Sequence, residues 1–176
     1  RHAAQQFRML QDAEILPHGR LQRGGQTLIN FSSNDYLGLS HHPTLIARAK
    51  EYADTYGTGS TASRLVCGNH PAYRVIEEKL AAGKGTETAL IFSSGYQANV
   101  TVLAALADAE IVGRPIILAD RLCHNSLLQG ALLSGARLMR FNHNDNDHLR
   151  EMLQKHTAPD TQIIIVTESV FGMDGD

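Results

Sequence analysis

The sequence has no tryptophan, only two cysteines and no long apolar run. Cys67 and Cys123 have neither CxxC nor metal-ligand spacing, and two cysteines in a chain of this length do not form a disulfide framework. We interpret both as reduced packing residues. No apolar stretch approaches the roughly 20 residues of a membrane-spanning helix, and the first residues show no continuous apolar signal region. We therefore expect a cytoplasmic protein with no membrane role.

The sequence also lacks a block of charge of one sign. The 16 Lys+Arg and 18 Asp+Glu residues are interspersed, and the formal net charge is −2. Nucleic-acid binding draws on clustered basic residues, so the charge pattern argues against a nucleic-acid partner. With 43% hydrophobic residues, a chain of 176 residues can bury the core of one globular domain. A small-molecule or protein partner is expected.

Short β-branched runs alternate with helical patterns along most of the chain. Strands separated by helices of this length form a parallel sheet with helices over both faces, so the predicted fold class is α/β. Two helices with a proline in the first turn come first, and four strands then alternate with three helices. The predicted helices cover residues 42–56, 69–83, 98–107, 125–135 and 144–156, and the predicted strands cover residues 88–92, 114–120, 136–142 and 161–169.

Ligands of open α/β sheets bind beyond the carboxyl ends of the strands, which directs attention to residues 93–96, 120–124, 142–144 and 168–176. The first of these segments reads SSGY and precedes a helix. A glycine at such a turn lets backbone N–H groups approach an anion, and the helix dipole favours negative charge there. A phosphate would suit this turn. The alternative is that Ser93 and Ser94 only cap a core helix.

Other familiar motifs are absent or lie in the wrong context. GTGSTA, which starts at Gly57, follows a predicted helix, whereas a dinucleotide-binding fingerprint follows a strand. The Gly83-Lys84 pair lacks the rest of a P-loop, and there is neither a G-x-S-x-G elbow nor an H-E-x-x-H helix. The nine histidines include no helical i, i+4 pair, so we expect no metal site.

Six segments together resemble one enzyme family. In chain order they are NFSSNDYLGLSHHP, YGTGSTASRLVCGNHPAYRVIEEKLA, FSSGYQAN, LADRLCHNSLLQG, FNHND and VTESVFGMDGD. They resemble successive motifs of the α-oxoamine synthases, which are pyridoxal-phosphate enzymes of fold type I. These enzymes condense an amino acid with an acyl thioester and release carbon dioxide. The resemblance is strongest to members that use alanine and pimeloyl-CoA or a pimeloyl-carrier protein. Glycine-using members such as 2-amino-3-ketobutyrate CoA ligase share the same framework.

The resemblance implies a fold and an assembly. The expected fold is the large domain of a PLP-dependent transferase of the aspartate aminotransferase type, with a mostly parallel sheet and covering helices. Residues 1–40 would form an N-terminal arm, and residues 41–176 would form the N-terminal part of the PLP-binding domain, incomplete at its C-terminus. A homodimer is implied.

The resemblance also implies cofactor contacts. Gly95 and Tyr96 would present backbone donors to the phosphate of pyridoxal phosphate. His124 would be the catalytic residue that stacks on the pyridine ring and contacts the substrate, and Glu168 would lie near the ring. Gly172 stands where close relatives have a serine beside the cofactor.

Substrate contacts are implied for Asn34 and Arg8. Asn34 matches a residue close to the substrate carboxylate. Arg8 matches an arginine that pairs with the distal carboxylate of the acyl substrate, a task for which a guanidinium is suited because it can bind a carboxylate through two hydrogen bonds. The alternative for Arg8 is an exposed charge on an N-terminal helix.

The lysine that holds the cofactor as a Schiff base in this family would come after Asp176. Lys50, Lys79, Lys84 and Lys155 instead match polar faces or ends of helices. We therefore expect residues 1–176 alone to be inactive, and to expose a large apolar surface unless a partner or further chain covers it. The alternative is a truncated or partner-binding relative without catalytic activity.

Overall fold

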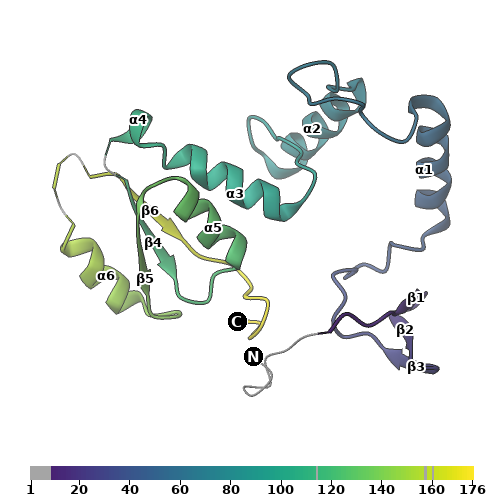
Figure 1. The fold of residues 1–176 in the computed structure, drawn as a ribbon, viewed down its shortest axis with the longest axis horizontal. Helices are drawn as coiled ribbons and strands as arrows, with labels where there is room; N and C mark the ends of the chain where they lie inside the picture. The colour runs from purple at the N-terminus through teal and green to yellow at the C-terminus, as the bar shows by residue number, and fades with distance from the viewer. Residues whose placement is uncertain (1–8, 114, 157, 160) are drawn as a thin grey trace. The chain divides into compact units, whose positions relative to one another are not determined.

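The computed structural model describes residues 9–113, 115–156, 158–159 and 161–176 (Figure 1). They fall into two compact units, Arg1–His70 (unit 1) and Pro71–Asp176 (unit 2). The division that we predict from the resemblance, an N-terminal arm of residues 1–40 followed by part of a PLP-binding domain, remains a prediction. Among the described residues, no helix combines the length and apolar character needed to cross a membrane.

Unit 1 opens with a three-stranded antiparallel sheet that the sequence analysis does not predict. Its strands are β1 (Glu14–Leu16), β2 (Arg20–Arg23) and β3 (Gln26–Ile29), in the order β1-β2-β3. Gly24 and Gly25 join β2 to β3, with φ angles of 57° and 76°. Two successive residues with positive φ form the tight turn that suits the twist of a hairpin, and glycine adopts this conformation without steric cost.

The helix predicted near residue 43 is confirmed as α1 (Pro43–Tyr56). Pro43 occupies its first turn, and Gly57, at a φ of 79°, ends it as predicted. None of its residues is buried, and its apolar face stays about half exposed, with Tyr56 in an edge contact with the ring of His70 at a centroid distance of 4.2 Å. Phe31 (92%), Tyr36 (88%) and Leu65 (100%) are also largely exposed. Unit 1 thus exposes the apolar surface that we expect.

Unit 2 contains a parallel sheet with strand order β5-β4-β6, which confirms the predicted α/β fold class. The segment 88–92 is not a strand, because the Ile91 N–H donates to Glu77 Oε1 at 2.9 Å instead of pairing with a neighbouring strand. The prediction of a strand there is wrong. The elements are α2 (Pro71–Lys84), α3 (Gly95–Leu106), α4 (Ala109–Val112), β4 (Ile116–Asp120), α5 (Asn125–Leu133), β5 (Arg137–Phe141), α6 (Asn146–Gln154) and β6 (Ile163–Val166).

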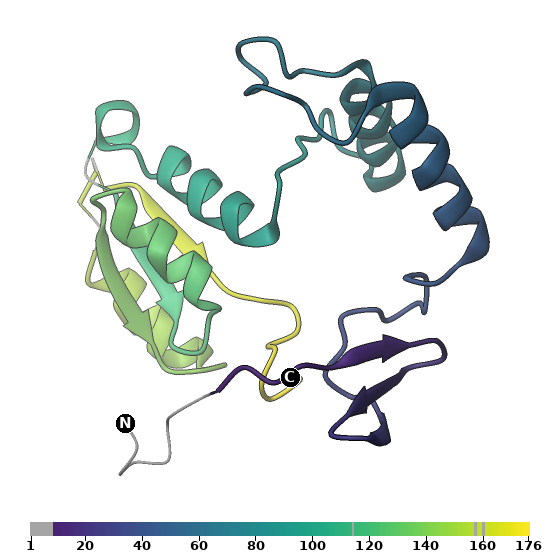
Figure 2. The ribbon, with the colours of Figure 1, turned by 45° about the vertical axis from the view of Figure 1, so that its right-hand side comes forward.

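The central strand β4 is buried along its whole length and divides the core of unit 2 into two parts. Successive side chains of a strand point to opposite faces. Ile117 and Ala119 pack with Leu103 of α3 and Ala131 of α5, whereas Leu118 packs on the other face against residues that include Met152 of α6. Figure 2 shows α5 and α6 on opposite faces of the sheet.

Close packing of α5 on α3 depends on Gly130, and this gives a testable prediction. A Cβ at Gly130 would lie 2.9 Å from the backbone oxygen of Asn99. We expect Gly130→Ala to destabilise the protein by about 1–3 kcal/mol because the two backbones must move apart. The matched control is Gly83→Ala in α2, where a Cβ meets no atom within 4 Å. The control should be neutral or stabilising by about 0.5–1 kcal/mol. Chemical denaturation measures both, and equal stabilities for the two variants would contradict the prediction.

Candidate active site

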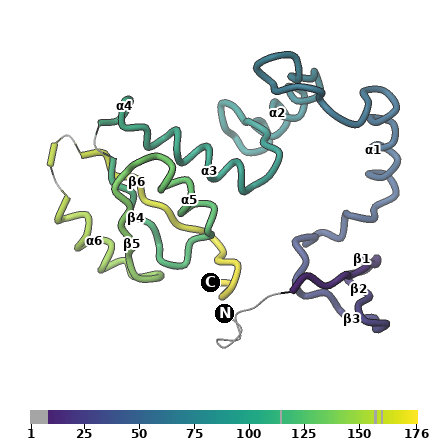
Figure 3. Tube along the Cα trace, in the orientation of Figure 1, coloured from purple at the N-terminus to yellow at the C-terminus, as the bar shows by residue number. Residues whose placement is uncertain are grey.

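A cavity of about 380 Å³ opens beyond the carboxyl ends of β4 and β6. Figure 3 shows the segments that follow these strands, with the yellow C-terminal segment leaving β6. The structure brings three residues singled out from the sequence, His124, Glu168 and Gly172, to the wall of this one cavity. The full lining is Leu122, Cys123, His124, Asn125, Glu168, Phe171, Gly172, Met173 and Asp174.

Hydrogen bonds hold His124 where β4 leads into α5. His124 is the N-cap of α5, where its Nδ1 accepts from the Ser126 N–H at 3.2 Å and lies 2.7 Å from Ser126 Oγ. The fully buried Ser126 also contacts Asn99 Nδ2 of α3 at 2.9 Å. The backbone N–H of His124 donates to Glu168 Oε1, which ties the residue to the segment after β6. Three elements therefore fix the position of His124.

The thiol beside His124 is a packing group. Cys123 is buried, and its Sγ donates to the Val166 carbonyl oxygen at 3.4 Å. Desolvation, with smaller effects of the nearby Glu168 and Asp120 carboxylates, raises the pKa of the Cys123 thiol to about 11. A neutral thiol is a poor nucleophile, so the packing interpretation of Cys123 is confirmed. Cys67 is a free cysteine that is exposed, and its interpretation as a packing residue is wrong.

Gly95 and Tyr96 are the first two residues of α3 and do not line the cavity. Ser94 caps this helix, because its Oγ accepts from the Gln97 N–H at 3.1 Å. Helix geometry leaves the N–H groups of Gly95 and Tyr96 without an acceptor in the helix. The bond between Asn99, the fifth residue of α3, and Ser126, the second residue of α5, joins the N-terminal halves of the two helices. The turn at Gly95 and Tyr96, which we predict to bind an anion, and His124 thus lie at the starts of two helices that are bonded to each other.

A second polar cluster lies at the ends of β4 and β5, in strand-end segments to which the sequence directs attention without assigning these residues a role. Asp120 is fully buried and accepts from the Leu122 N–H at 2.8 Å and the Asn144 N–H at 3.0 Å. His143 lies between two carboxylates, with Nδ1 2.9 Å from Asp120 Oδ1 and Nε2 2.9 Å from Asp176 Oδ2. The position after a strand marks these segments in the sequence, but only the structure pairs His143 with the two aspartates.

Asp120 and His143 each favour the charged form of the other. Desolvation acts to raise the pKa of Asp120, but hydrogen bonds from Leu122, Asn144 and His143 outweigh it and the net pKa is lowered. The hydrogen bond with Asp120 is the main cause that raises the pKa of His143. His143, Asp174 and Asp176 offer ligand atoms within 4.8 Å of one another. Both ring nitrogens of His143 already face carboxylate oxygens, so we interpret the group as an ion-paired cluster.

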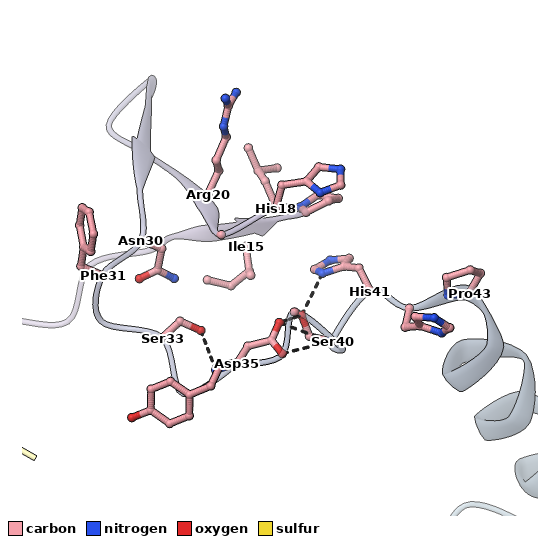
Figure 4. A pocket seen from close by; sticks show the side chains of 16 residues that line it. Ile15, His18, Arg20, Asn30, Phe31, Ser33, Asp35, Ser40, His41 and Pro43 are labelled. Atoms are coloured by element: carbon pink, nitrogen blue, oxygen red, sulfur yellow. Dashed lines mark hydrogen bonds between the residues drawn. The ribbon is translucent and has the colours of Figure 1, made fainter. Parts of the chain in front are cut away.

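The two substrate residues expected from the sequence both precede unit 2 in the chain. Asn34 is exposed in unit 1, in the segment between β3 and α1. Arg8 lies outside the described residues. Unit 1 contains a cavity of about 460 Å³, whose lining includes Arg20, Asn30 and Asp35 (Figure 4) but not Asn34. Asp35 orders this loop by accepting from the Leu39 N–H at 2.8 Å and the Ser40 hydroxyl at 2.6 Å.

Known proteins resemble this chain over most of its length. The model of the family "Aminotransferase class I and II" matches residues 26–176. An 8-amino-7-oxononanoate synthase from Trichlorobacter lovleyi is 50% identical over 170 residues, which are 97% of this chain and 42% of that protein. The serine palmitoyltransferase of Sphingomonas wittichii is 32% identical, with a TM-score of 0.84 over 93% of this chain and 40% of its own.

A second solved structure is the serine palmitoyltransferase of S. paucimobilis with bound PLP and myriocin. It is 29% identical, with a TM-score of 0.84 over 93% of this chain and 41% of its own. The chain spans less than half the length of the curated relatives that it matches. The match of the family model covers most of the chain. The chain therefore belongs to the aminotransferase class I and II family, and its relatives place it among the α-oxoamine synthases.

Proposed function

We propose that the protein that carries this chain condenses L-alanine with a pimeloyl thioester and releases carbon dioxide to give 8-amino-7-oxononanoate. The main support is the cavity at the strand ends, where His124, Glu168 and Gly172 meet. Relatives named for this reaction are 50% and 51% identical to the chain. Pyridoxal phosphate is the cofactor. The thioester is pimeloyl-CoA or a pimeloyl-carrier protein, and a homodimer in the cytoplasm remains a prediction.

The described residues fit pyridoxal phosphate in two respects. A phosphate needs backbone donors at a helix end, and Gly95 and Tyr96 offer two N–H groups where a Cβ on Gly95 would meet no atom within 4 Å. A pyridine ring needs a flat partner, and His124 presents an imidazole at the cavity wall. Bound pyridoxal phosphate would supply an electron sink for the amino acid's reacting carbon.

The roles that we assign follow from these positions. His124 would contact the cofactor ring with its face and donate a hydrogen bond to the substrate. Glu168 would keep the His124 backbone in place through the hydrogen bond between them. Asn34 and Arg8 would bind the carboxylates of the substrates. Gly172 leaves room at the wall where close relatives carry a serine hydroxyl, so a water could take the place of that hydroxyl.

Substrate selection tests this proposal. We expect kcat/KM for L-alanine to exceed that for glycine by at least about tenfold, because one methyl group in a fitted pocket provides that discrimination. Octanoyl-CoA, which lacks the distal carboxylate, is the matched control for pimeloyl-CoA and should react more slowly. The products are identified by mass spectrometry. Faster reaction with glycine or serine, or equal rates for the two thioesters, would contradict the proposed reaction.

A catalytically inactive, partner-binding relative is the second candidate. The two candidates differ in whether a lysine, which the resemblance places after Asp176, holds the cofactor as a Schiff base. Borohydride treatment of the protein with pyridoxal phosphate, followed by peptide mass mapping, separates the two candidates. A lysine that carries the reduced cofactor supports the enzyme. A protein that binds the cofactor without any modified lysine supports the inactive relative.

A further inference from the structure

The direction of the hydrogen bonds around His124 can be worked out from a single backbone donor. The Ser126 N–H can only donate, and it lies 3.2 Å from His124 Nδ1. Nδ1 must then carry a lone pair instead of a proton. The Ser126 hydroxyl, 2.7 Å from the same nitrogen, must donate to it. Asn99 must in turn donate its Nδ2–H to Ser126 Oγ, at 2.9 Å.

We propose that Asn99 and Ser126 are positioning residues that hold His124 as the tautomer with its proton on Nε2. The chain of donors runs in one direction, from Asn99 through Ser126 to Nδ1 of His124. Ser126 is fully buried and Asn99 is half-buried, so water does not compete readily for these bonds. The remaining proton of the neutral ring therefore belongs to Nε2, which makes no hydrogen bond with any described residue.

This tautomer defines the chemistry that His124 offers to the cavity. An Nε2–H group donates a hydrogen bond and cannot accept one, so it selects an oxygen acceptor. A carboxylate or carbonyl oxygen of the substrate has this property, whereas an ammonium group does not. The inference deepens the proposed function because it assigns His124 the role of donor and names the two residues that enforce it.

Two variants and a matched control test the inference. Ser126→Ala removes the hydroxyl donor. Asn99→Asp is nearly isosteric but cannot donate to Ser126, so it should draw the hydroxyl proton away from His124. Ser134→Ala is the matched control, because Ser134 lies at the other end of α5, where its hydroxyl donates to the Ala131 carbonyl oxygen at 2.7 Å. Thermal melts identify any variant that has lost its fold.

The first readout is the nitrogen-15 NMR spectrum of the histidine rings in cofactor-free protein, assigned with His124→Asn. The wild type and Ser134→Ala should show a protonated Nε2 and an unprotonated Nδ1, and both test variants should show a mixture of tautomers. The second readout is kcat, which should fall about tenfold or more in the test variants, the usual effect of removing the partner that orients a functional histidine.

A protonated Nδ1 in the wild type would overturn the inference, as would test variants whose tautomer and kcat match those of Ser134→Ala. The NMR measurement needs neither cofactor nor substrate. It therefore decides the tautomer even if the protein makes no product from alanine and a pimeloyl thioester, an outcome that would contradict only the proposed reaction.

Discussion

His124→Asn should lower kcat/KM by about a hundredfold to a thousandfold, which is the usual range when a group that acts on the reacting atoms is lost. Asparagine is a good N-cap, so it can still accept from the Ser126 N–H and preserve the start of α5. It cannot provide the aromatic face or the Nε2–H donor. Steady-state kinetics with alanine and pimeloyl-CoA measure the loss, and thermal melts should show little change in stability.

The matched control for His124→Asn is His156→Gln. His156 follows α6 and lies before β6 in the chain, whereas the cavity lies beyond the carboxyl end of that strand. Its replacement should leave kcat/KM unchanged. Equal kinetics for the two variants would show that His124 has no part in the reaction, and its position at the cavity would then be structural.

Asp120→Ala should cost about 3–5 kcal/mol of folding free energy, because it removes a buried carboxylate that accepts two backbone N–H groups and pairs with the partly exposed His143. The variant leaves the N–H groups of Leu122 and Asn144 without their acceptor and His143 without one of its two carboxylates. Chemical denaturation measures the loss. Asp147→Ala is the control, because Asp147 is 90% exposed on α6 and pairs only with Arg150 among the described residues. A loss no larger than that of the control would contradict this account.

The pH dependence of stability follows from the same cluster. The pKa of Asp120 is lowered in the folded protein, so its contribution is present above the unfolded pKa of about 3.9 and is lost as the pH falls. The pKa of His143 is raised, so its contribution is full below the unfolded pKa of about 6.5 and is lost as the pH rises through the raised value. The stability difference between wild type and Asp120→Ala should therefore be largest between about pH 4 and pH 6.5. A flat difference would contradict the ion pair.

The sheet of unit 2 could be predicted because its signals are local. The run Ile116–Asp120 is apolar and bounded by turn residues, and Asp145 gives α6 a capping side chain whose Oδ1 accepts from the His148 N–H at 2.9 Å. Residues 88–92 have a similar apolar pattern but pair with no strand in the part of the chain that the structure describes. Strand formation depends on a neighbour, which a single sequence does not reveal.

The hairpins and the polar cluster were harder to predict for different reasons. β1 to β3 are short and mostly exposed, so they lack the alternation that marks a half-buried strand, although Gly24-Gly25 is a hairpin signal. The Asp120–His143–Asp176 cluster joins residues far apart in the chain, and only the parallel order of β4 and β5 brings the first two together. Their positions after strands mark His124 and Glu168 as candidates in the sequence. The sequence does not reveal the hydrogen bonds that orient these two residues.

The most direct test of the central claim is a crystal structure of the protein that carries this chain with pyridoxal phosphate bound. We expect the phosphate to accept hydrogen bonds from the backbone N–H groups of Gly95 and Tyr96, with the pyridine ring against the imidazole of His124 and near Glu168. A cofactor bound elsewhere, or a ring that does not touch His124, would contradict the assignment of this cavity as the cofactor site.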